Sequence, residues 1–169
     1  MRKSKNPSKP PKGNAAKYFA YREAWTRIKL ATEQGFFLEA IAIEESIISD
    51  RLLAYLIAAG ALNKPQEAYQ CPSLNKIIAK WKEHFPEAIQ TSVFEDVHAA
   101  TDEWRRLRNK ALHQIVKLHS EAATNAIDDF LVVAQTAAKN GNALAKAISY
   151  WCENRIKTLL RQRLERAIP

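Results

Sequence analysis

Residues 36–59 read FFLEAIAIEESIISDRLLAYLIAA, and their apolar side chains recur at helical spacing. A helix of this kind is apolar around most of its circumference, so it must be buried on most sides. We therefore expect either the central helix of a bundle or half of a subunit interface, ended by Gly60. One side of the helical wheel carries Phe37, Ile41, Ile48, Leu52 and Tyr55, and much of the rest carries Ile43, Leu53, Leu56 and Ile57.

Charged residues interrupt this apolar surface within the helix, namely Glu44, Glu45, Asp50 and Arg51. A buried carboxylate requires a partner. Glu44 and Arg51 lie two turns apart at nearly the same angle, so they can pair with each other or point at the arginine-rich helix described below. They can also line a narrow exposed strip of the helix, and we favour this last interpretation.

Helical patterns flank this stretch on both sides, which predicts an all-α bundle of about five to six helices. A first helix is expected from near Asn14 to a stop at Gly35. Residues 63–73 read as a loop that contains two prolines. A short helix is then expected to begin at Ser73 and to stop before Pro86.

The region from residue 87 to residue 140 contains no Gly or Pro, and it is too long for one typical globular helix. Ser92 and Glu95 have the spacing of a capping box, in which each side chain bonds a free backbone N–H of the helix start. We expect this pair to open a helix that holds residues 103–113.

That helix is expected to break between His113 and Ser120, and Ser120 then caps a new helix that ends at Gly141. A last helix is expected over residues 143–166. Its cationic end suits a helix C-terminus on dipole grounds, and it could also form a second phosphate-binding surface. The cations concerned are Arg155, Lys157, Arg161, Arg163 and Arg166.

The net charge of +8 is concentrated near the N-terminus. Residues 1–13 are rich in Pro, Ser and Lys, so we expect a disordered basic tail before a single helical domain over residues 14–169. A basic arm commonly holds nucleic acid by phosphate charge, and it is as often only a solubility feature. The first 17 residues carry Arg2, Lys3, Lys5, Lys9, Lys12 and Lys17 and no acid.

The two cysteines, Cys71 and Cys152, lie far apart and lack the spacing of metal ligands. This suggests free thiols in a reducing compartment. No apolar run is long enough to cross a bilayer without charges. We therefore expect a soluble, cytoplasmic protein.

Residues 103–113, EWRRLRNKALH, are the one segment whose residues suggest chemistry. Trp104, Leu107 and Ala111, followed by Ile115 and Leu118, form a core-facing stripe at helical spacing. Asn109 and His113 lie one turn apart on a common face away from that stripe. A solvated polar face rich in Arg and Lys is an equally open interpretation.

The segment Arg108-Asn109-Lys110-Ala111-Leu112-His113 resembles the Arg-Asn-x-x-x-His form of the motif of the HEPN superfamily. These are small all-helical domains, many of them ribonucleases of toxin, phage-defence and RNA-processing systems. The resemblance covers about residues 36–120, the expected HEPN-like core, and leaves residues 121–167 as additional C-terminal helices. It implies RNA cleavage without a metal or cofactor, leaving a 2′,3′-cyclic phosphate, and a possible cognate antitoxin or regulatory protein.

Metal-free RNA cleavage requires a base for the 2′-hydroxyl proton and a cation for the charge that grows on the phosphate. Histidine titrates near neutrality, so His113 is the candidate base. Arginine presents a planar fork that matches phosphate oxygens, so Arg108 is the candidate phosphate clamp. Asn109 could orient the imidazole or the phosphate. Neighbouring cations are candidates to bind RNA, namely Arg105, Arg106, Lys110 and Lys117.

In an unbroken helix, Arg108 and His113 point about 140° apart, because each residue turns the helix by about 100°. They could share one phosphate only if the helix breaks between them or if two chains contribute to one site. The HEPN resemblance implies the second, because members commonly dimerise with their motifs facing a cleft. Leu112 and Val116 are candidates to pack around such a two-fold axis.

Two other classes of protein stay open. One is a catalytically inactive HEPN-like module that binds RNA or a partner protein, and the other is a structural bundle in which the motif arose by chance. Glu95-x-x-His98 resembles half of a di-iron site, but a second copy of that motif is missing, so we expect His98 to be a polar surface residue. A DNA-binding helix-turn-helix is disfavoured because no short Gly-containing turn joins suitable helices.

Overall fold

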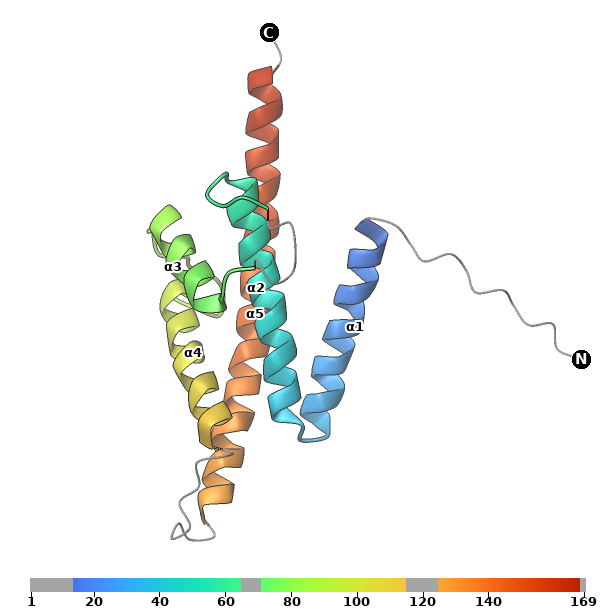
Figure 1. Cartoon of the computed structure of the whole chain (residues 1–169), viewed down its shortest axis with the longest axis vertical. Coiled ribbons are helices and arrows are strands. Elements are labelled where there is room, and N and C mark those ends of the chain that lie inside the picture. Colours follow the sequence, from blue (N-terminus) through green and yellow to red (C-terminus); the bar gives the residue numbers. More distant parts are fainter. Residues whose placement is uncertain (1–13, 65–70, 115–124, 168–169) are drawn as a thin grey trace, which may run out of the picture.

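The computed structural model describes residues 14–64, 71–114 and 125–167. These residues form an all-α bundle, as expected, and contain no strand. The long helices lie side by side (Figure 1). The described elements are α1 (Asn14–Glu33), α2 (Phe37–Ala58), α3 (Leu74–His84), α4 (Val97–Gln114) and α5 (Asn125–Ala167).

Helix α2 is the central helix, because it packs against α1, α3, α4 and α5. Ile41, Ile48 and Leu52 are fully buried, which is the consequence of an apolar surface that extends nearly all round the helix. Both ends follow the expected glycine signals. Gly35 has φ +80° and Gly60 has φ +78°, a left-handed conformation that suits glycine and stops a helix.

Helix α5 contradicts the expectation of two helices divided at Gly141, because it runs unbroken from Asn125 to Ala167. Gly141 is required by packing rather than by a turn. A Cβ atom there would lie 2.1 Å from Oε2 of Glu44 and 2.6 Å from Nε1 of Trp104. The missing side chain thus lets α5 approach α2 and α4 closely, at a cost of about 1 kcal/mol in helix propensity.

The start of α4 also differs from the expected capping box of Ser92 and Glu95, because the helix begins at Val97. The side chain of Asp96 fills the capping role: its Oδ1 accepts hydrogen bonds from the backbone N–H of His98 at 2.9 Å and of Ile89 at 3.3 Å. Ser92 lies in the preceding loop. There the Oγ1 of Thr91 accepts the backbone N–H of Phe94 at 2.9 Å and closes a turn.

His98 is buried, so the expectation that it is a polar surface residue was wrong. Its ring packs edge-on against Trp81, with ring centroids 4.3 Å apart. Burial lowers the pKa of the imidazole and favours its neutral form. A histidine one residue into α4 faces the core here because the cap residue Asp96 sets where the helix begins.

Several expectations concern residues outside the described ranges: the disordered tail over residues 1–13, the break and cap between residues 115 and 120, and the core positions Ile115 and Leu118. Both cysteines are free, with Cys71 exposed and Cys152 buried. Among the described helices, none combines the length and the apolar character that a membrane span requires.

Candidate functional site

Arg108 is anchored between α4 and α2. Its Nε donates a hydrogen bond of 3.0 Å to Oε2 of Glu45, and its Nη2 forms an ion pair with the same carboxylate. A third contact runs along α4, where Nη1 donates to Oδ1 of Asn109 at 2.5 Å. The Arg108 and Glu45 side chains keep 20% and 26% of their surface exposed. The guanidinium is therefore held in one orientation while it stays accessible to solvent.

His113 lies exposed on the last described turn of α4. Helix α4 continues through it to Gln114 without a break. The two side chains therefore leave the helix about 140° apart and are separated by about 7.5 Å along its axis. A helix break between Arg108 and His113 is excluded, and one chain does not bring them to a common phosphate.

The cations expected to bind RNA around the motif are not equivalent. Arg105 donates a hydrogen bond of 3.2 Å from Nη1 to Oδ1 of Asn75 on α3. Arg106 and Lys110 are exposed. Lys117 lies outside the described residues, as does Val116. Leu112, the other candidate for packing around a two-fold axis, keeps 36% of its surface exposed and so remains available for a contact.

Glu45 is the site residue that the sequence did not single out. The carboxylates of α2 were expected to line an exposed strip, but Glu45 instead points at the arginine-rich helix α4. Glu45 could have been found from the general rule that an acid on an apolar helix needs a partner. That rule was applied to Glu44 and Arg51, which form no pair with each other among the described residues.

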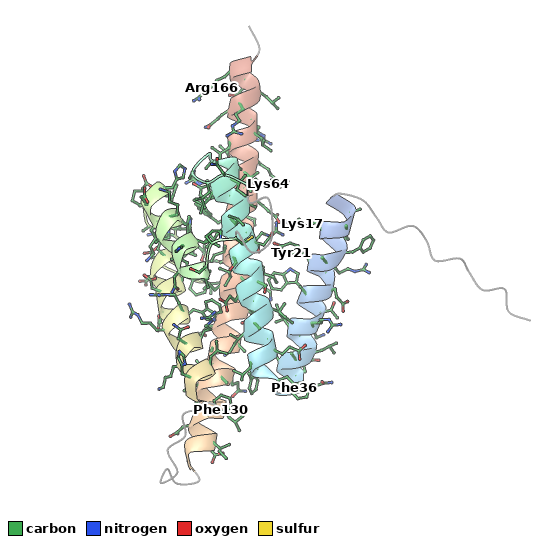
Figure 2. All side chains as sticks on the ribbon, viewed as in Figure 1. Lys17, Tyr21, Phe36, Lys64, Phe130 and Arg166 are labelled. Atoms are coloured by element: carbon green, nitrogen blue, oxygen red, sulfur yellow. The ribbon has the colours of Figure 1, made fainter. Side chains whose placement is uncertain are left out.

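Arg51 instead joins α2 to α1 and α5. Its Nη2 pairs with Oε1 of Glu153 on α5 at 3.0 Å. Its guanidinium carbon also lies 4.0 Å from the centre of the Tyr21 ring on α1. Tyr21 reaches from α1 towards α2 (Figure 2) and donates a hydrogen bond to Asp50. Burial and this carboxylate raise the pKa of the Tyr21 hydroxyl, so the hydroxyl keeps its proton and donates it to Asp50.

Glu44 is fully buried between α2, α4 and α5, which rules out the exposed strip for this residue. Neither carboxyl oxygen has a hydrogen-bond partner among the described residues. Burial raises the pKa of Glu44 from 4.5 to about 9, so the side chain is a neutral acid at neutral pH. It packs beside Trp104, whose Nε1 donates a hydrogen bond of 3.0 Å to the carbonyl of Ala137.

Two of the cations at the end of α5 contact other parts of the bundle. The Nη2 of Arg163 donates a hydrogen bond of 2.6 Å to the carbonyl of Ala58, at the C-terminus of α2. Arg155 stacks over the rings of Phe85 and Trp151. The last turns of α5 extend beyond the other helices and carry Arg166 at their end (Figure 2). All five cations are exposed, and Lys157, Arg161 and Arg166 form no hydrogen bond or ion pair among the described residues.

No protein-family model matches this chain, and no curated protein and no solved structure matches it either. These comparisons therefore neither support nor contradict the resemblance of residues 108–113 to the HEPN motif, which stays a prediction. What the structure adds is the helical fold and the position of each motif side chain on α4.

Proposed function

We propose that this protein is a metal-independent endoribonuclease of a toxin or phage-defence type, with Arg108, Asn109 and His113 in its active site. The observation that carries the proposal is the anchored arginine. Glu45 and Asn109 hold the Arg108 fork at the surface of the helix that also exposes His113. A cation fixed in advance stabilises developing charge without reorganising during the reaction.

The reaction follows from these side chains. The neutral imidazole of His113 takes the proton of a ribose 2′-hydroxyl, and the 2′-oxygen then attacks the adjacent phosphorus. The bond from phosphorus to the 5′-oxygen breaks, that oxygen takes a proton from water, and the imidazolium of His113 gives its proton to the hydroxide that is left. The products are a 2′,3′-cyclic phosphate and a 5′-hydroxyl end. Arg108 offers its N–H groups to the phosphate oxygens while their negative charge grows.

The site is assembled from two chains. Because α4 is unbroken, Arg108 of one protomer and His113 of the other must meet across a two-fold axis to act on one phosphate. The exposed Leu112 lies next to His113 and contributes apolar surface to the contact. A cytoplasmic location and a cognate antitoxin belong to the same proposal, because such an enzyme would have to be restrained in the compartment that contains its substrate.

The test is cleavage of a mixed-sequence RNA in the presence of a metal chelator, followed by analysis of the product ends. Cleavage should leave cyclic phosphates and fall at least a hundredfold in His113→Ala and Arg108→Ala, because each removes a reacting group. The matched controls are His84→Ala and Arg27→Ala, which remove an exposed histidine and an exposed arginine from other helices. Loss of activity in the controls, or full activity in the site variants, would refute the assignment.

A second function has one observation in its favour, namely the ion pair that already neutralises Arg108 within its own chain. A HEPN-like module that binds RNA or a partner protein without cleaving RNA needs this pair only for stability. The same assay separates the two: RNA that is retained but never cleaved, with retention insensitive to His113→Ala, supports the binding module.

A further inference from the structure

A groove runs along α5 on a surface that the motif does not use. It is bounded on one side by the loop of residues 90–93 and on the other by α5 from Lys139 to Thr158, and its volume is about 770 Å³. This stretch of α5 is about 28 Å long at 1.5 Å per residue. The volume falls within the range of roughly 300–1,000 Å³ that is usual for ligand sites.

The walls of the groove are held in place by contacts within the bundle. Thr91 closes the loop, because its Oγ1 accepts the backbone N–H of Phe94 and its own N–H donates to the Phe94 carbonyl at 2.9 Å. On the other wall, Trp151 packs edge-on against Tyr55 and Trp81, with ring centroids 4.7 and 5.5 Å apart. The groove is therefore formed before any ligand arrives.

The charge of the groove is of one sign. Lys139, Lys146 and Arg155 line it and are exposed, and no Asp or Glu lines it. None of the three forms an ion pair with any described carboxylate. Cations without acidic partners attract an anionic ligand.

The spacing of these cations favours an extended ligand. Lys139 and Lys146 leave α5 on the same face, about 10 Å apart along its axis, whereas Arg155 lies about 13 Å further along and about 180° around the helix from Lys146. One phosphate cannot reach all three. Between the last two lies Tyr150, which keeps 71% of its surface exposed. Two cations and an exposed ring on one face of α5, Lys139, Lys146 and Tyr150, match a strand of phosphates whose bases stack on aromatic side chains.

We propose that this groove binds single-stranded RNA, with Lys139 and Lys146 contacting phosphates and Tyr150 stacking against a base. The choice of RNA rather than DNA rests on the proposed function. The hydrogen bond from Trp104 to the Ala137 carbonyl places the Lys139 end of the groove level with Trp104, one turn before Arg108. The groove then leads away from the motif along α5, where it holds the strand outside the cleavage site.

The test measures binding of a fluorescent twelve-nucleotide RNA to the full chain carrying His113→Ala, so that cleavage does not interfere. Lys139→Glu with Lys146→Glu should weaken binding at least tenfold at moderate salt. The matched control is Lys29→Glu with Lys76→Glu, which makes the same change of charge at exposed residues that do not line the groove and should change binding less than threefold. Tyr150→Ala should weaken binding about fivefold or more, and Tyr18→Ala should not.

The outcomes distinguish this site from the proposed function. Equal losses in the groove pair and the control pair would mean that net charge alone binds RNA, and would overturn the site. Competition by polyglutamate as strong as by unlabelled RNA, with no effect of Tyr150→Ala, would overturn it as well. Groove-dependent binding by a protein that never cleaves RNA would keep the site and refute the ribonuclease. Cleavage without groove-dependent binding would do the reverse.

Discussion

The packing of the bundle buries Glu44, whereas the charged form of its carboxyl group would require water or a partner. The carboxyl group is fully buried without a hydrogen-bond partner among the described residues, so its proton is retained to a pKa of about 9. A neutral acid costs less to bury than a carboxylate and keeps the space beside Gly141 filled.

This burial predicts a dependence of stability on pH. The pKa of Glu44 is raised in the folded chain, so between 4.5 and about 9 the unfolded chain loses the proton while the folded chain keeps it. Stability therefore falls as pH rises through this window, by up to about 1.4 kcal/mol per pH unit. In Glu44→Gln this contribution is absent. Urea unfolding at pH 5, 7 and 8.5 should show the wild type losing stability relative to the variant as pH rises.

The other titrating groups are common to both proteins, so they cancel in the difference between wild type and variant. Glu39→Gln is the control, because Glu39 is exposed on the same helix and its removal should leave a difference that does not vary with pH. A constant offset between wild type and Glu44→Gln over the whole range would mean that Glu44 ionises normally.

At the scale of the element, the start of α4 distinguishes two candidate caps. Asp96 accepts the backbone N–H groups of His98 and Ile89, so Asp96→Ala should lower the free energy of unfolding by about 1–2 kcal/mol. Ser92→Ala should change it by less than about 0.5 kcal/mol, because Ser92 lies in the loop before the helix. Urea unfolding at pH 7 measures both, and Asp96→Asn should retain most of the stability.

The difference in unfolding free energy between the wild type and Asp96→Ala should also depend on pH. Burial opposes the charge of Asp96, but hydrogen bonds from the backbone of His98 and Ile89 outweigh it and lower the pKa. The stabilisation is therefore present above the ordinary pKa of the carboxyl group and is lost as pH falls through the lowered value. The loss of unfolding free energy in Asp96→Ala should become smaller in acid. An equal loss in Ser92→Ala would support the capping box of Ser92 and Glu95 instead.

The ends of α1, α2 and α3 could be predicted because their signals are local. Gly35 and Gly60 stop helices through their own backbone conformation, and Pro86 prevents α3 from continuing. Gly141 looks like the same local stop signal, but it does not end a helix. Its role is set by Glu44 and Trp104, which belong to two other helices. No window of the sequence around Gly141 contains that information.

The candidate site divides in the same way. The face shared by Asn109 and His113 follows from helix periodicity, and α4 is helical at both residues. The partner of Arg108 is Glu45, 63 residues away in the chain, and periodicity alone could not choose it over its neighbour Glu44. Both are adjacent acids on an apolar helix, and only the packing angle between α2 and α4 decides which one is exposed to Arg108.

At the scale of the whole molecule, the proposed chemistry depends on symmetry. A two-fold dimer that pairs Arg108 of one protomer with His113 of the other contains two equivalent sites. Such a dimer should form at micromolar concentration in sedimentation experiments. A wild-type protein that cleaves RNA as a monomer would require Arg108 and His113 to act on one phosphate from a single unbroken helix, which their separation of about 140° opposes.

Shared sites predict complementation between two inactive variants. Mixing Arg108→Ala and His113→Ala in equal amounts, with exchange of protomers, gives about half mixed dimers, and each mixed dimer contains one site with both residues intact. Activity should therefore recover to about a quarter of the wild-type value, although each variant alone is inactive. If both residues acted within one chain, no combination would restore a site. Mixed dimers that form but stay inactive would therefore refute the shared site, whereas recovery would identify which residue each protomer supplies.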